Sequence, residues 1–98
     1  MTSAPEPDRA ERLAALVLAV PDVADLHGGQ FGEVATYLPG RRVSGISLTE
    51  DACAVHISVR YPANVVEVAA RVRAALAAEL AVPVHVTVED VRSEGHPR

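Results

Sequence analysis

The sequence predicts a two-layer α/β sandwich, with two helices packed on one face of a mixed sheet in the order helix, three to four strands, helix, strand. Two segments carry apolar residues at helical spacing, and alternating segments lie between and after them. Alternation of apolar and polar residues is typical of strands covered on one face only. A strand that follows the second helix after a strand–helix connection is expected to run parallel to its neighbour.

The two helices are defined by their start and stop signals. Asp8 and Glu11 have the spacing of a capping box, and Pro21 ends the first helix. The second helix is expected at residues 64–81, where Asn64 is the cap residue and Glu67 follows it by the same three positions. The expected core stripes are Leu13, Leu16, Val17 and Val20 in the first helix, and Val65, Val68, Ala69, Val72, Leu76 and Leu80 in the second.

Five segments are expected to form strands: Val23–Leu26, Glu33–Leu38, Val43–Thr49, Cys53–Tyr61 and residues 83–89. The fourth alternates most regularly. Its core face is expected to carry Cys53, Val55, Ile57, Val59 and Tyr61, and its outer face Ala54, His56, Ser58 and Arg60.

The length of 98 residues is that of one domain, expected at residues 8–92 because every periodic segment lies there. Residues 1–7 and 93–98 are polar and rich in proline or glycine, so both are expected to be disordered tails.

Charge and composition exclude several function classes. The formal net charge of −4 argues against binding to nucleic acid or to an anionic membrane surface. No run approaches the roughly 20 apolar residues of a membrane span, and the N-terminus does not have the pattern of a signal peptide. The lone cysteine, Cys53, fits a reducing compartment. We therefore expect a soluble, cytoplasmic protein.

No catalytic set is expected. Cys53 and His56 are three residues apart on one strand, so their side chains should point to opposite faces and cannot form a thiolate–imidazole pair. Gly28, Gly29 and Gly32 precede a strand rather than a helix, which favours a loop with positive φ angles over a phosphate-binding loop. The sequence thus predicts no enzyme and no cofactor.

Two surface features are candidates for binding. His56 and His85 should both face outward on strands of one sheet, with Glu89 as a third ligand, so a small metal- or ligand-binding module is the alternative function. Arg41 and Arg42 follow Pro39-Gly40 in an expected exposed turn and are the candidate partner-binding residues, because paired arginines can hold carboxylates in a bidentate manner.

Part of the chain resembles the alkaline-shock family of envelope stress response proteins, in its actinobacterial form. The resemblance rests on LHGG at Leu26–Gly29, GEVATYLPGRRV at Gly32–Val43, VHISVRY at Val55–Tyr61 and PVHVTVEDV at Pro83–Val91. It implies a non-enzymatic protein of cell-envelope homeostasis without catalytic, cofactor or metal residues. It also implies action through a protein partner, recruitment to the inner face of the membrane where that partner is anchored there, and self-association in some members.

Overall fold

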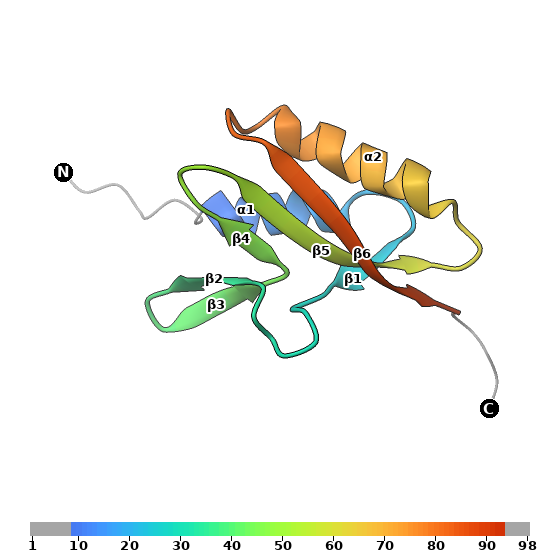
Figure 1. Ribbon diagram of the computed structural model, residues 1–98, viewed down its shortest axis with the longest axis horizontal. Coiled ribbons are helices and arrows are strands. Elements are labelled where there is room, and N and C mark those ends of the chain that lie inside the picture. Colours follow the sequence, from blue (N-terminus) through green and yellow to red (C-terminus); the bar gives the residue numbers. More distant parts are fainter. Residues whose placement is uncertain (1–8, 94–98) are drawn as a thin grey trace.

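The computed structural model describes residues 9–93, which form two helices and six strands (Figure 1). The helices are α1 (Arg9–Leu18) and α2 (Val65–Ala77). The main sheet is mixed and contains β1 (Val23–Leu26), β4 (Ile46–Leu48), β5 (Cys53–Arg60) and β6 (Val84–Arg92). The antiparallel hairpin beside it consists of β2 (Ala35–Leu38) and β3 (Arg41–Ser44).

The predicted fold class is confirmed. Both helices lie on the same face of the main sheet, and β6 runs parallel to β5 while β1 and β4 run antiparallel to it (Figure 1). Five strands lie between the helices, three in the main sheet and two in the hairpin. The architecture is therefore an α/β sandwich with the expected order of elements.

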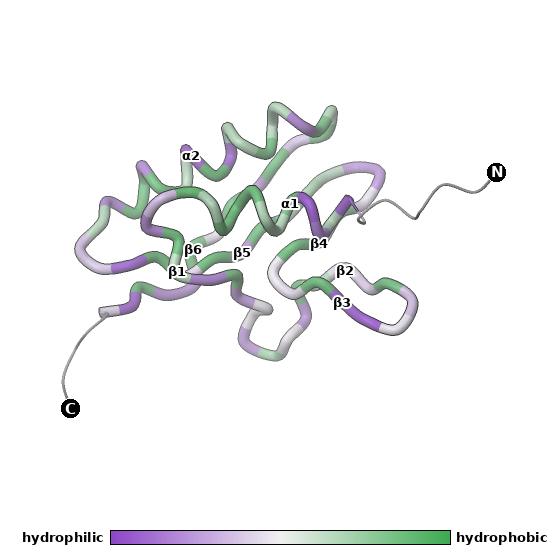
Figure 2. The backbone as a smooth tube through the Cα atoms, turned by 180° about the vertical axis from the view of Figure 1, so that it is seen from behind, coloured by the Kyte–Doolittle hydropathy of each residue, from purple (hydrophilic) through white to green (hydrophobic). Residues whose placement is uncertain are grey.

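The core lies between the helices and the sheet and is built from small and medium apolar side chains. Figure 2 shows β5 as a largely hydrophobic segment facing the helices. The largest fully enclosed apolar side chains come from α1, α2, β4 and β5, and they are Leu13, Val17, Ile46, Cys53, Val55, Ile57, Val59, Val68, Val72 and Leu76. No aromatic residue belongs to the core cluster of the described residues.

Strands β1 and β4 lie end to end along one side of β5. β4 pairs with the first half of β5 and β1 with the second half. The chain leaves this edge at His27, whose N–H donates to the carbonyl of His56 (2.8 Å), and returns at Gly45, whose carbonyl accepts from the N–H of His56 (2.9 Å). Residues 28–44 are therefore an excursion from one interrupted edge strand, and we call them the loop–hairpin insertion.

Several element boundaries differ from the sequence-based prediction. The predicted strand Val43–Thr49 is two strands, because Gly45 has a φ of +87° and breaks the pairing. A side chain at Gly45 would lie 2.7 Å from the Cβ of Leu26, so the close approach also requires glycine. α2 ends at Ala77, four residues before the predicted end, and its Asn64 cap is confirmed by a 3.0 Å bond from the Glu67 N–H to Asn64 Oδ1.

For two residues the burial is the opposite of what the alternation along the strand predicts. Ser58 was expected on the polar outer face but is completely buried. Both neighbouring strands have a bulge beside it, with Ala24 and Glu89 as the extra residues, and this crowds the position. Tyr61 was expected in the core but lies beyond the end of β5 and is 66 % exposed.

The predicted cap residue Asp8, the predicted tail at residues 1–7 and all of the predicted tail at residues 93–98 except Ser93 lie outside the described part of the chain. Within residues 9–93, neither helix is long and apolar enough to cross a membrane.

Candidate functional site

The loop–hairpin insertion begins with a glycine-rich loop that is held by one carboxylate. Glu33 Oε1 accepts a hydrogen bond from the Phe31 N–H at 2.9 Å. A hydrogen bond from the Glu33 N–H, together with this one from Phe31, lowers the pKa of Glu33 below its ordinary value of 4.5, and the nearby His56 and His27 rings act in the same direction. The φ of +86° at Gly29 favours glycine, and a Cβ there would lie 2.6 Å from Glu33 Oε2 and so displace the carboxylate. The loop therefore has a defined shape, as its positive-φ glycines predict.

The base of the loop is closed by backbone bonds. The Val34 N–H donates to the carbonyl of Gly28 at 2.8 Å, and the Gly45 N–H donates to the carbonyl of Val34 at 2.7 Å. At the tip, Phe31 is 84 % exposed. The result is a closed loop that presents an aromatic ring to solvent.

The hairpin that follows has two different faces. Residues directly opposite one another share a face, so Thr36, Leu38, Arg41 and Val43 form the inner face, where Val43 is buried. The Thr36 hydroxyl donates to the carbonyl of Ile46 at 2.6 Å and accepts from the Leu48 N–H at 3.3 Å. These two bonds attach the hairpin to the outer side of β4.

The outer face of the hairpin carries the cross-strand pair Tyr37 and Arg42. Tyr37 is 69 % exposed, and Arg42 is exposed without an ion pair among residues 9–93. An ideal Cβ on Gly28 would lie 3.8 Å from the Cβ of Ser44, a residue of this same face, so the glycine-rich loop packs beside it. We call Phe31, Tyr37 and Arg42 the insertion surface.

The two candidate arginines therefore have different surroundings. Both lie on β3 rather than in the expected turn, and they point to opposite faces of the hairpin. Arg41 holds Glu11 of α1 in a bidentate ion pair, with Nε–Oε2 at 2.6 Å and the second contact at 3.1 Å. Sequence reasoning missed this pair because its members are thirty positions apart and no local pattern connects them.

The predicted separation of Cys53 and His56 is borne out. Cys53 is buried in the core, and burial raises the pKa of its thiol above the ordinary value of 9.0. His56 lies on the outer face, where its Nδ1 contacts Glu89 Oε2 at 2.5 Å. His85 aligns with Ala54 and Thr87 with His56, so the two histidines are diagonal neighbours on adjacent parallel strands.

Among the described residues, the His56–Glu89 contact is not part of a larger group of metal ligands. Within residues 9–93 there is no group of three or more His, Cys, Asp or Glu side chains that could hold a metal ion. Ser58, two positions after His56, has a buried Oγ without a hydrogen-bond partner among the described residues. It is closed to solvent, so a Ser–His–Glu arrangement would have no accessible nucleophile here. His96 lies outside the described residues.

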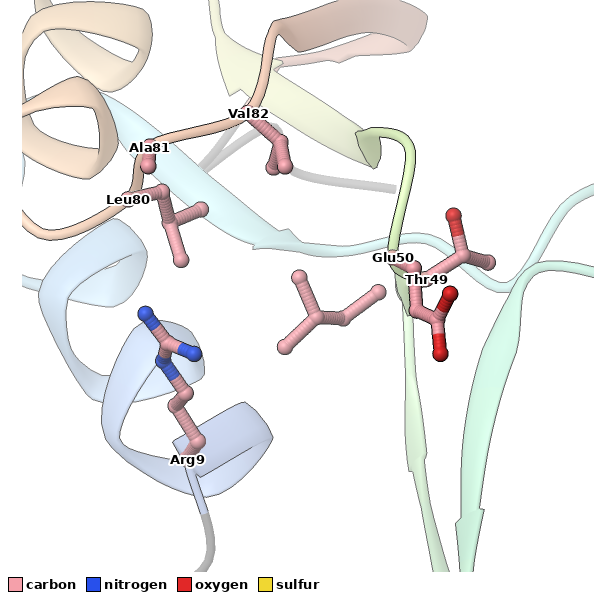
Figure 3. A pocket seen from close by; sticks show the side chains of 7 residues that line it. Arg9, Thr49, Glu50, Leu80, Ala81 and Val82 are labelled. Atoms are coloured by element: carbon pink, nitrogen blue, oxygen red, sulfur yellow. The ribbon is translucent and has the colours of Figure 1, made fainter.

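An open pocket of about 480 Å³ lies where α1 begins, between the β4–β5 turn and the α2–β6 connection (Figure 3). Apolar side chains from Leu48, Leu80 and Val82 line it, with Arg9 and Glu50 among its polar residues. The guanidinium of Arg9 donates to the carbonyl of Glu79 at 3.3 Å. None of the sequence-based candidate residues contributes to this pocket.

Comparisons with known proteins identify the fold and leave the family open. No family model matches the chain, and no curated protein matches it. Among solved structures, the chain is similar to a variant of the MamM CTD, with a TM-score of 0.55 and 20% identity, covering 94% of this chain and 91% of the other. At this level of identity the similarity shows a shared fold, which includes nearly the whole length of both chains.

Proposed function

We propose that this chain is a non-enzymatic interaction module of the cell envelope that binds a protein partner through the insertion surface. The observation that carries the proposal is the placement of the aromatic residues. The chain contains one Phe, two Tyr and no Trp, and all three aromatic side chains are exposed while the core consists of smaller residues. Aromatic side chains contribute strongly to interface energetics, and they are enriched with arginine at interface hot spots.

The geometry supports the insertion as the place of contact. Phe31 and Tyr37 belong to it, and Arg42 lies directly across the hairpin from Tyr37. The loop and hairpin are tied to the main sheet by backbone and Thr36 hydrogen bonds, so little conformational entropy would be lost on binding. Arg41 has a supporting role in this proposal, since its ion pair with Glu11 connects the hairpin to α1.

The resemblance to the alkaline-shock family supports the envelope assignment. Its densest part, residues 23–43, covers most of the loop–hairpin insertion, so the family pattern and the exposed aromatic residues occur in one segment. From this resemblance we also propose a cytoplasmic location and recruitment to the inner face of the membrane by an anchored partner. The enclosed thiol of Cys53 and hydroxyl of Ser58 support a function without catalysis.

A comparative pull-down tests this function. The tagged full-length chain is incubated with host lysate prepared with and without membranes, and captured proteins are quantified by mass spectrometry. Losing one hot-spot side chain costs about 2 kcal/mol, more than tenfold in affinity, so the variant Phe31→Ala/Tyr37→Ala/Arg42→Ala should lose its specific partner.

The matched control is Tyr61→Ala/Arg71→Ala, which removes an exposed aromatic residue and an exposed arginine outside the insertion. Both variants should melt close to the parent temperature. Equal capture by the parent, the insertion variant and the control would contradict the proposal.

The contact between His56 and Glu89 favours a second candidate, a metal- or ligand-binding module that uses His56 and His85. Two potential ligands already meet, and a zinc site would need at least one further donor. Zinc titration by calorimetry tests it. Saturable binding that is lost in both His56→Ala and His85→Ala would support the module, and heats no larger than dilution would remove it.

A further inference from the structure

The two edges of the main sheet differ in whether their outward backbone N–H and C=O groups have hydrogen-bond partners. On the side of β4, the Thr36 hydroxyl bonds to the carbonyl of Ile46 and to the N–H of Leu48, and the carbonyl of Val34 accepts from Gly45. The loop–hairpin insertion thus covers that edge. An edge strand with unpaired backbone groups can pair with another chain, and cover of this kind prevents it.

The edge formed by β6 has no such cover among residues 9–93. This nine-residue strand pairs only with β5 in the described structure. The Cys53 N–H donates to the carbonyl of Pro83, so by alternation His85 and Thr87 also direct their backbone groups toward β5. The N–H and C=O groups of Val84, Val86 and Val88 therefore point outward from the sheet.

The sequence of this edge does not protect it. Residues 84–92 contain neither lysine nor proline, the residues that commonly block edge pairing. The bulge lies at Glu89, beyond the regular stretch 84–88. The side chains of His85 and Thr87 on the outer face are exposed.

The flank of α2 next to this edge is also uncovered. Arg9 and Arg12 of α1 both contact Glu79, just beyond α2, so that side of the helix faces α1. At 3.6 residues per turn, the flank directed away from α1 carries the exposed residues Val66, Ala70, Arg73 and Ala77. Val66 is 74 % exposed, and the two alanines leave room for a close approach by another helix.

We propose that β6 pairs antiparallel with β6 of a second copy of this chain, across a two-fold axis at Thr87. In this register Val86 lies opposite Val88 of the second copy in a hydrogen-bonded pair, and Thr87 lies opposite its own equivalent in a non-hydrogen-bonded pair. His85 lies opposite Glu89 of the second copy, twice, so each imidazole faces a carboxylate. The main sheets then join into one continuous sheet, and the uncovered flanks of α2 face each other.

The strand is self-complementary only in this direction. In a parallel arrangement of the same two edges, one copy would be turned over about the strand axis, so His85 would no longer share a face with Glu89 of the second copy and the helices would lie on opposite faces of the joined sheet. The antiparallel arrangement also closes by two-fold symmetry, which stops the assembly at a dimer. It leaves the insertion surface free, because the insertion lies along the opposite edge of the sheet (Figure 1).

Register-specific disulfide formation in the full-length chain tests the dimer. Thr87→Cys places two thiols at a non-hydrogen-bonded pair with Cα atoms about 4.5 Å apart, within reach of a disulfide. His85→Cys is the matched control, since its two copies are offset by four residues, about 13 Å along the strands. The native Cys53 is buried, and the parent chain should not cross-link.

We expect Thr87→Cys to form a covalent dimer under mild oxidation and His85→Cys to remain largely monomeric on a non-reducing gel. Sedimentation of the parent should shift from monomer to dimer with concentration, and Thr87→Lys should raise the dissociation constant severalfold by placing two cations opposite each other. A parent that sediments as a monomer at every concentration would overturn the proposal. Equal cross-linking of the two cysteine variants would overturn the register.

Discussion

The hydroxyl of Thr36 should contribute measurably to the stability of the whole domain. It is partly buried and bonds to two backbone groups of β4, at 2.6 Å to the carbonyl of Ile46 and at 3.3 Å from the N–H of Leu48. Thr36→Val keeps the shape of the side chain and removes both bonds. The backbone groups would then lack their partner at an edge that the hairpin still shields from water.

Leaving a buried polar group unsatisfied costs about 1–3 kcal/mol. Because the site is partly buried and one of the two bonds is long, we expect a loss of about 2 kcal/mol in the free energy of unfolding. For a domain of this size, 1 kcal/mol corresponds to about 4–8 °C, so the melting temperature should fall by roughly 10 °C.

Urea unfolding followed by far-UV circular dichroism provides the measurement, since the chain has no Trp for fluorescence. Thr87→Val is the matched control, because Thr87 is exposed on the outer face of β6 and should change stability by less than about 0.5 kcal/mol. The urea unfolding of Thr87→Val should be measured at low protein concentration, where dimerisation does not contribute to stability. If Thr36→Val and Thr87→Val unfold at the same urea concentration, the hydroxyl does not hold the hairpin to β4.

Three further outcomes are expected. Cys53 should react with DTNB far more slowly in the native than in the unfolded chain. Because burial raises the pKa of its thiol, the free energy of unfolding should fall as pH rises above 9.0, and Cys53→Ala should weaken that fall in alkaline unfolding curves. Because the pKa of Glu33 is lowered, its contribution to stability is present above pH 4.5 and is lost as the carboxylate is protonated at lower pH. Native hydrogen exchange at the Phe31 amide should therefore accelerate below pH 4.5 by more than the intrinsic pH effect, and Glu33→Gln should abolish this additional acceleration. Arg41→Ala should lower stability by about 0.2–1 kcal/mol through loss of an exposed ion pair, whereas Arg42→Ala should melt normally and lose partner capture; the reverse pattern in melting and pull-down assays would contradict the assignment of the two arginines.

The sequence was informative about the fold wherever one segment carries a complete signal. Cys53, Val55, Ile57 and Val59 alternate without interruption, and all four are fully buried. Asn64 caps α2 as its spacing to Glu67 predicts. These features depend on residues close together in the chain.

Features that depend on two distant segments were not predictable in the same way. The burial of Ser58 results from bulges in both neighbouring strands, and alternation within β5 contains no information about them. The pairing of Arg41 with Glu11 depends on the position of the hairpin against α1. The sequence predicted both candidate histidines on the outer face of one sheet but left open whether their strands are adjacent, and Glu89 reaches His56 from a bulge that the sequence does not reveal.

The meeting of His27 and Gly45 at a single residue, His56, has a consequence for how this fold can diversify. A segment whose ends bond to the same residue closes locally, and the entropic cost of closing a loop rises only slowly with its length. Residues 28–44 could therefore be lengthened, shortened or exchanged with little effect on the register of the main sheet. The helices and sheet would act as a constant frame, and partner choice could change through this one segment alone.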